Sequence, residues 1–100
     1  IQGLIDGNID VVATDHAPHT WDEKQGKYFS APSGLPLTQF AVQALLEHVH
    51  RGVMSLPQMV EKWSHNVAKR YKMIDRGFIR EGYWADLVLI DMERPATGSA

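Results

Sequence analysis

A short apolar segment that ends at a carboxylate is the feature that most constrains this chain. Residues 9–13 read IDVVA, and residues 14–19 continue as TDHAPH. A nearly continuous apolar run of this length is typical of a strand buried on both faces of a parallel sheet. In α/β proteins the side chains that carry the chemistry stand at the carboxyl ends of such strands. The sequence therefore predicts an active-site edge at Asp15 and the histidines that follow it.

The sequence pattern after residue 36 predicts helices followed by further strands. Apolar residues recur at helical spacing after the proline-rich and glycine-rich loop, and Ser55 stands where a helix N-cap is expected, two residues before a proline. After Gly77 the pattern changes to that of strands. The expected elements in chain order are a strand over residues 9–14, a long loop over 17–36, helices over 37–50, from 55 onward and over 65–71, and strands over 78–79 and 85–91.

Composition excludes several classes of protein. The 100 residues are 44% hydrophobic and 22% charged with a formal net charge of −2, which is typical of a soluble globular chain and gives no electrostatic case for binding nucleic acid. The longest uncharged stretch, residues 28–46, contains prolines and a glycine, so we expect no membrane span. Cysteine is absent, which rules out thiolate metal sites and agrees with a cytoplasmic location.

Three segments in the right order resemble one enzyme family. The TDHAPH motif of residues 14–19 resembles the signature of dihydroorotases, which belong to the metal-dependent amidohydrolase superfamily. Residues 77–91 are similar to the GxIxxGxxADLVxxD segment of that superfamily, and residues 65–69 are similar to its NPA(K/R) helix start, with Val67 in place of the usual proline. The resemblance covers nearly the whole chain.

The resemblance implies an α/β fold and a C-terminal fragment of a larger enzyme. Residues 1–76 would hold the last strand, the active-site loop and the helices of a (β/α)8 TIM barrel. Residues 77–100 would supply strands of a small composite β-sandwich. Separated from its barrel, the strand at residues 9–14 would lack both sheet neighbours, and its backbone groups would need other partners.

The resemblance also assigns roles to Asp15 and His19. It implies that Asp15 is a ligand of a catalytic zinc and takes the proton from the attacking water, a task that a carboxylate performs readily. It implies that His19 binds the carboxylate of the substrate, as a charge-assisted donor does well. The alternatives are that Asp15 only caps the following turn and that His19 bonds a backbone carbonyl of the loop.

The neighbouring residues receive supporting roles. Dihydroorotases use backbone groups of a loop that corresponds to Pro32, Ser33 and Gly34 to hold the dihydropyrimidine ring. His16 would face away from Asp15, because adjacent side chains of an extended segment point to opposite faces, and it would support the loop.

The family's zinc centre, of one or two ions, needs further ligands that lie outside this chain. We therefore expect the 100 residues alone to be inactive. The full-length protein would act on a small-molecule substrate, L-dihydroorotate or N-carbamoyl-L-aspartate, in pyrimidine biosynthesis and would form a homo-oligomer. Two other interpretations stay open: a related cyclic amidohydrolase such as a hydantoinase or allantoinase, and an inactive dihydroorotase-like scaffold subunit.

Overall fold

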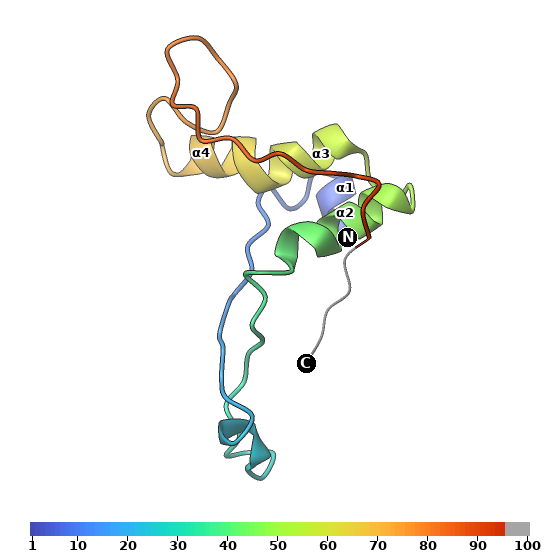
Figure 1. Cartoon of the computed structure of the whole chain (residues 1–100), viewed down its shortest axis with the longest axis vertical. Helices are drawn as coiled ribbons and strands as arrows, with labels where there is room; N and C mark the ends of the chain where they lie inside the picture. Colours follow the sequence, from blue (N-terminus) through green and yellow to red (C-terminus); the bar gives the residue numbers. More distant parts are fainter. Residues whose placement is uncertain (96–100) are drawn as a thin grey trace.

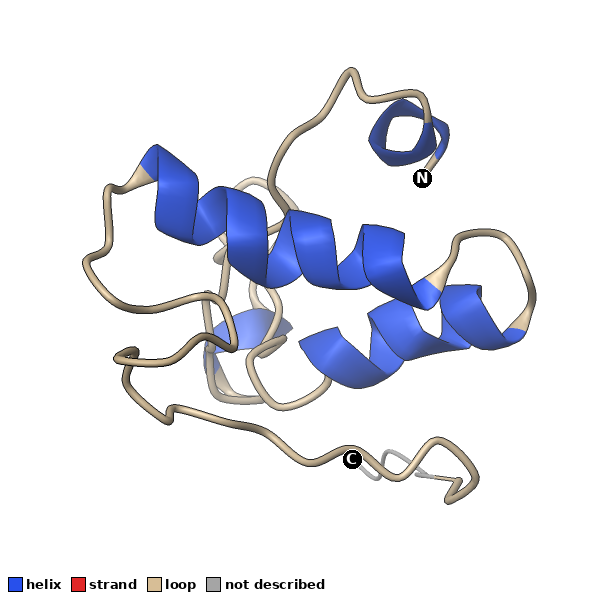
Figure 2. Cartoon of the chain, turned by 90° about the horizontal axis from the view of Figure 1, so that it is seen from above, coloured by secondary structure: helices blue, strands red, loops and turns tan. Residues whose placement is uncertain are grey.

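The fold consists of short helices joined by long irregular segments. The computed structural model describes residues 1–95, and within that range it contains no β-strand (Figure 2). The elements are the α-helices α1 (Gln2–Ile5), α2 (Ala41–His50), α3 (Leu56–Val60) and α4 (Asn66–Arg70), the 3₁₀-helix η1 (Glu23–Gln25) and the π-helix η2 (Glu61–His65). None of the helices in residues 1–95 has the length and apolar character needed to cross a membrane.

Residues 41–70 form the packed part of the molecule, which we call the helical body. Helix α2 lies against the continuous helix built from α3, η2 and α4 (Figure 2). Leu45, Met54 and Met59 are buried between them, at 7%, 4% and 3% exposure. Partly buried apolar side chains surround these three: Ile5, Val12, Val42, Leu46, Val49 and Trp63. Removal of this apolar surface from water is what holds the helices together.

The helix that follows residue 55 begins where the sequence predicts. The Ser55 Oγ accepts a hydrogen bond from the backbone N–H of Gln58 at 3.3 Å, and the Gln58 side chain accepts one from the backbone N–H of Ser55 at 2.9 Å. This reciprocal capping box satisfies two N–H groups that the first turn would otherwise leave without partners. Ser55 is thus confirmed as the N-cap.

Two predicted helix boundaries are wrong. Helix α2 begins at Ala41 and not at residue 37, because Phe40 has a φ of −108° and residues 38–40 form a turn. The two helices expected after residue 55 are one continuous helix, joined through the π-helix η2. The wide turn is marked by a hydrogen bond from the backbone N–H of Asn66 to the carbonyl of Glu61, five residues earlier.

The start of the chain is attached to this wide turn. The backbone N–H of Val12 donates to the carbonyl of Lys62 at 3.2 Å. The Asn66 side chain donates to the carbonyl of Asp10 at 2.9 Å. Residues 10–12 are therefore held by the helix and not by a sheet neighbour.

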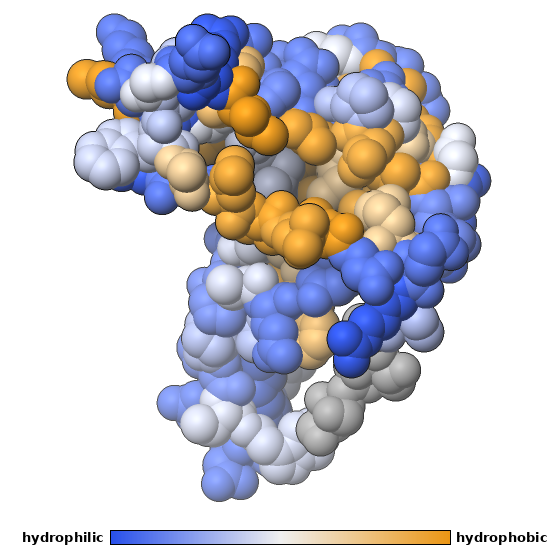
Figure 3. Space-filling model, turned by 45° about the horizontal axis from the view of Figure 1, so that its top comes forward, coloured by the Kyte–Doolittle hydropathy of each residue, from blue (hydrophilic) through white to orange (hydrophobic). Residues whose placement is uncertain are grey.

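The expected strands are not formed within residues 1–95. Residues 9–14, 78–79 and 85–91 have no ladder partner, and the single isolated bridge in the described range is a parallel one between His16 and Leu35. A strand needs a neighbour about 4.8 Å away to bond its backbone groups, and no described segment takes that place beside them. The apolar interior expected for residues 85–91 is exposed instead, with Val88 and Leu89 at 83% and 101%. Figure 3 shows that apolar side chains gather on an exposed face of the molecule. The described residues 1–95 thus show neither the barrel nor the sandwich.

Residues 13–40 extend away from the helical body, and we call them the projecting loop (Figure 1). The molecule measures 52 × 31 × 28 Å, and its radius of gyration is 16.5 Å. A compact domain of this length would have a radius of gyration of about 13 Å. The loop is therefore a distinct limb.

Residues 77–95 return along the helices (Figure 1). The ring of Phe78 stacks on that of His65 at 4.3 Å, and Ser64 Oγ donates to the carbonyl of Gly77 at 3.4 Å. Arg76 forms an ion pair with Asp86. The last five residues of the unit predicted over 77–100 lie outside the described residues.

Candidate functional site

Asp15 stands at the base of the projecting loop in an unusual backbone conformation. Its φ is +46°, in the left-handed region that aspartate and asparagine tolerate better than most residues. Its side chain is exposed, and within residues 1–95 no hydrogen bond from a backbone N–H to its carboxylate is found. The turn is capped by Thr14, whose Oγ1 accepts from the backbone N–H of His16 at 3.2 Å. The carboxylate of Asp15 is therefore available to a ligand.

His16 holds the two sides of the projecting loop together. Its Nδ1 accepts a hydrogen bond from the backbone N–H of Thr38 at 3.2 Å, so the neutral ring carries its proton on Nε2. The next residue, Ala17, donates its backbone N–H to the carbonyl of Leu35 at 3.2 Å. These contacts agree with the supporting role expected for His16.

His19 lies further along the loop beside Glu23. The His19 Nδ1 is 3.7 Å from Glu23 Oε2, an ion pair only when the ring is protonated, and the His19 side chain is 29% exposed. Glu23 accepts a hydrogen bond from the backbone N–H of Thr20 at 2.7 Å, and its own N–H donates to Thr20 Oγ1 at 3.3 Å. The bond from the Thr20 backbone, followed by that from its hydroxyl, lowers the pKa of the Glu23 carboxyl below its ordinary value. The Glu23 side chain beside His19 is therefore a carboxylate at neutral pH.

The segment over residues 32–34 is fixed by a lysine that sequence reasoning did not identify. Lys24 Nζ donates to the carbonyl of Pro32 at 3.1 Å and to that of Gly34 at 2.6 Å. Gly34 has a φ of +120°, and a Cβ placed on it would lie 2.7 Å from the carbonyl oxygen of Ala17. Only glycine combines this backbone conformation with so close an approach. Ser33, which lies between Pro32 and Gly34 in the sequence, is exposed.

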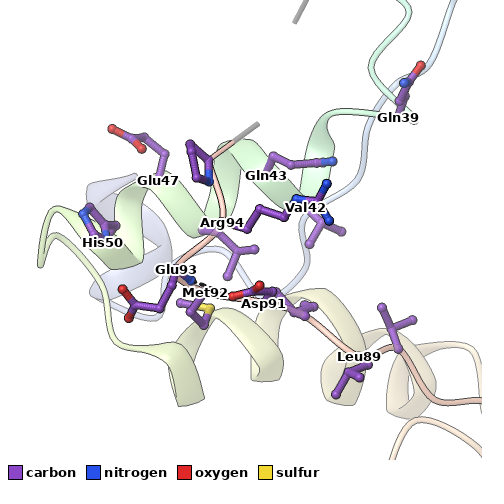
Figure 4. Close-up of a pocket in the computed structure, with 14 residues that line it drawn as sticks. Gln39, Val42, Gln43, Glu47, His50, Leu89, Asp91, Met92, Glu93 and Arg94 are labelled. Atoms are coloured by element: carbon purple, nitrogen blue, oxygen red, sulfur yellow. Dashed lines mark hydrogen bonds between the residues drawn. The ribbon is translucent and has the colours of Figure 1, made fainter. Parts of the chain in front are cut away.

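The structure brings the two predicted parts of the site to the same limb of the molecule. Residues 14–17 and 34–38 run side by side in Figure 1, joined by the bridge between His16 and Leu35. A groove elsewhere, between α2 and residues 88–95, is lined by residues such as Val42, Glu47 and Asp91 and contains none of the predicted site residues (Figure 4).

The described residues do not form a metal centre by themselves. Within residues 1–95 no three histidine, cysteine, aspartate or glutamate side chains lie close enough together to hold an ion. Zinc sites in proteins use three or four protein ligands. Asp15 is exposed and can supply one of them.

Comparison with known proteins assigns the chain to a family. No protein-family profile matches it. A dihydroorotase from Clostridioides difficile is 42% identical over 98 residues, which are 97% of this chain and 23% of that protein. A dihydroorotase from Halobacterium salinarum is 46% identical over 88 residues, or 88% of this chain and 21% of that protein. One from Lactococcus lactis is 44% identical over 94 residues, or 93% of this chain and 22% of that protein.

These matches define the class first and then the family. The relatives are hydrolases, and this chain is similar to one part of them. More narrowly, it corresponds to part of a dihydroorotase. It spans about a fifth of the length of the curated relatives that it matches.

Proposed function

We propose that this chain is the C-terminal part of a dihydroorotase that interconverts L-dihydroorotate and N-carbamoyl-L-aspartate in pyrimidine biosynthesis. One observation carries the proposal beyond sequence similarity. The segment with Asp15 and the segment with Gly34 are bonded side by side on one exposed limb, and a reacting carboxylate and a ring-holding loop require such an arrangement.

In this proposal Asp15 is the proton carrier. Hydrolysis of a cyclic amide needs a base for the attacking water and an acid for the leaving nitrogen, and one carboxylate can act as both in turn. Asp15 is exposed, so its carboxylate oxygens can reach a substrate. A zinc ion held by Asp15 and by ligands from outside this chain would supply positive charge that polarises water and the amide carbonyl.

His19 and the loop over residues 32–34 would bind the substrate. A carboxylate substituent on the ring is recognised by a protonated imidazole through a short charge-assisted hydrogen bond. The His19 Nδ1 lies 3.7 Å from Glu23 Oε2. Pro32, Ser33 and Gly34 would hold the ring through their backbone groups.

The remainder of the enzyme would cover the exposed apolar segments. We propose that residues 1–76 complete a TIM barrel and that residues 77–100 join a composite β-sandwich, where Val88 and Leu89 would be buried. The complete protein would be a cytoplasmic homo-oligomer.

The decisive experiment is a turnover assay of the full-length protein that contains this chain. Dihydroorotate, hydantoin and allantoin are offered separately, with the release of the ring-opened product as the readout. We expect turnover of dihydroorotate alone. Preferred turnover of hydantoin or allantoin would favour the sister enzymes, and no turnover of any of the three would favour a scaffold subunit.

Replacing Asp15 tests the proton carrier. In Asp15→Asn we expect kcat to fall by about three orders of magnitude, the range for loss of a general acid–base group. Asparagine keeps the left-handed backbone of this position, so the variant should fold normally. A variant with more than a tenth of the wild-type kcat would contradict the assignment.

Replacing His19 tests recognition of the substrate carboxylate. In His19→Ala we expect KM for dihydroorotate to rise by about tenfold or more, with a smaller change in kcat, because a charge-assisted hydrogen bond is lost. An unchanged KM together with a lowered kcat would remove His19 from this role.

Zinc affinity should distinguish the isolated 100 residues from the full-length protein. Calorimetric titration of the 100 residues alone should show no submicromolar site, since Asp15 is a single ligand. The full-length protein should show one. A tight site on the 100 residues alone would mean that the metal centre is built differently.

A further inference from the structure

Lys24 is the one described side chain that reaches across the projecting loop to two carbonyl groups. It is partly buried, and its Nζ donates to the carbonyls of Pro32 and Gly34, eight and ten residues further along. An exposed lysine normally keeps its ammonium in water, because ordering the long side chain costs entropy. Two hydrogen bonds from one charged group, one of them at 2.6 Å, offset that cost.

The two bonds fix the orientation of two peptide groups. The peptide bonds of this chain are trans within residues 1–95, so the N–H of each peptide points away from its C=O. The carbonyl of Gly34 faces Lys24, while the next residue, Leu35, forms the bridge to His16 on the other side. The carbonyl of Pro32 faces the same ammonium, so the N–H of Ser33 is turned away from Lys24.

The N–H of Ser33 has no partner among the described residues, and Ser33 is exposed. A backbone N–H with a fixed direction and no internal partner is a ready donor for a ligand. We propose that Lys24 is a positioning residue, which holds the Ser33 N–H in place for a carbonyl oxygen of the substrate ring. This inference rests on the proposed function, because that function supplies the cyclic amide that the donor would bind.

The test compares three variants in the full-length protein. Lys24→Met removes the ammonium and keeps a flexible apolar chain of similar length. Lys24→Arg keeps a charged donor that can bond two carbonyls. Lys27→Met is the matched control, because Lys27 is an exposed lysine on the same loop for which the described residues show no side-chain bond.

A positioning role predicts a specific kinetic pattern. In Lys24→Met we expect KM for dihydroorotate to rise about tenfold while kcat changes less than about threefold, since binding geometry is lost and the proton carrier stays. Lys24→Arg should recover most of the lost affinity, and Lys27→Met should match the wild type. Amide hydrogen exchange in residues 31–38 should become faster in Lys24→Met and stay unchanged in α2.

Other outcomes overturn the inference. A wild-type KM in Lys24→Met does so directly, and so does a fall in kcat that follows the fraction of folded protein with KM unchanged. Unchanged hydrogen exchange in residues 31–38 would also do so, whatever the kinetics. If the wild type does not turn over dihydroorotate, the proposed function fails first, and this inference fails with it.

Discussion

The helical body and the projecting loop are stabilised by different forces. In the helical body, Leu45, Met54 and Met59 are buried, and helix α3 begins at the Ser55 capping box. In the projecting loop no residue from 13 to 40 is buried, and the backbone is held by a few hydrogen bonds such as those of Lys24 and His16. The loop conformation thus depends on single bonds worth about 1 kcal/mol each, whereas the body depends on a shared core.

The helical body supplies the stability of the fold, and the projecting loop carries the predicted site residues. All five predicted site residues lie on the loop: Asp15, His19, Pro32, Ser33 and Gly34. A substitution in the body should weaken folding without altering the site, and one in the loop should alter the site without weakening the body.

Truncation of the core tests the first half of this comparison and should have the largest effect on stability. Met59 is 3% exposed, so Met59→Ala should lower the free energy of unfolding by about 2–5 kcal/mol through lost burial and a cavity. Denaturant unfolding measures this change. In the full-length protein, KM of the fraction that remains folded should equal that of the wild type, and an altered KM would show that the two regions are coupled.

An alanine at Gly34 tests the second half. The new Cβ would meet Ala17 while the backbone must keep a φ of +120°, so the loop must shift at a cost of about 1–3 kcal/mol. We expect faster amide exchange in residues 31–38 and a higher KM, with unchanged exchange in α2.

Gly52→Ala is the control for that variant. Gly52 also has a positive φ, of +68°, but a Cβ there would meet nothing within 4 Å. It should change neither the loop nor KM. Equal effects of the two variants on KM would show that the contact with Ala17 does not matter.

The smallest effect concerns the turn beside His19. The pKa of Glu23 is lowered in the folded chain, so its carboxylate stabilises the turn above the pKa of the unfolded state. This contribution is lost as the pH falls through the lower folded pKa. We expect the Thr20 amide resonance to follow this titration in the wild type and to stay constant in Glu23→Gln. A wild-type Thr20 amide resonance that does not change with pH would refute the hydrogen bond from Thr20 to the Glu23 carboxylate.

Local signals in the sequence predicted the helical body better than the expected strands. The Ser55 cap is encoded by neighbours three residues apart, so the sequence alone identifies it. The expected strand over residues 85–91 depends on partners from other parts of a sheet, and within residues 1–95 its apolar side chains are exposed. The residue pattern indicates what such a segment prefers, but pairing decides whether it becomes a strand.

The candidate site was predictable only where a motif was present. Asp15 and His19 stand in a recognisable run, whereas Lys24 acts through the distance from its Nζ to carbonyls eight and ten residues away. No spacing rule marks a lysine in an irregular loop. Its contribution becomes visible only when the backbone path is known.

The wide turn at η2 has a consequence for insertions and deletions in this region. The Asn66 N–H bonds the Glu61 carbonyl five residues earlier, so removal of one residue from 63–65 would leave the same two groups four residues apart, which is the spacing of a regular α-helix. Asn66 would then keep its direction toward the carbonyl of Asp10. An added residue would instead turn α4 by about 100°, the advance of one residue in an α-helix, and Asn66 would lose that carbonyl. The root of the limb that carries Asp15 should therefore tolerate the loss of a residue from the wide turn better than the gain of one.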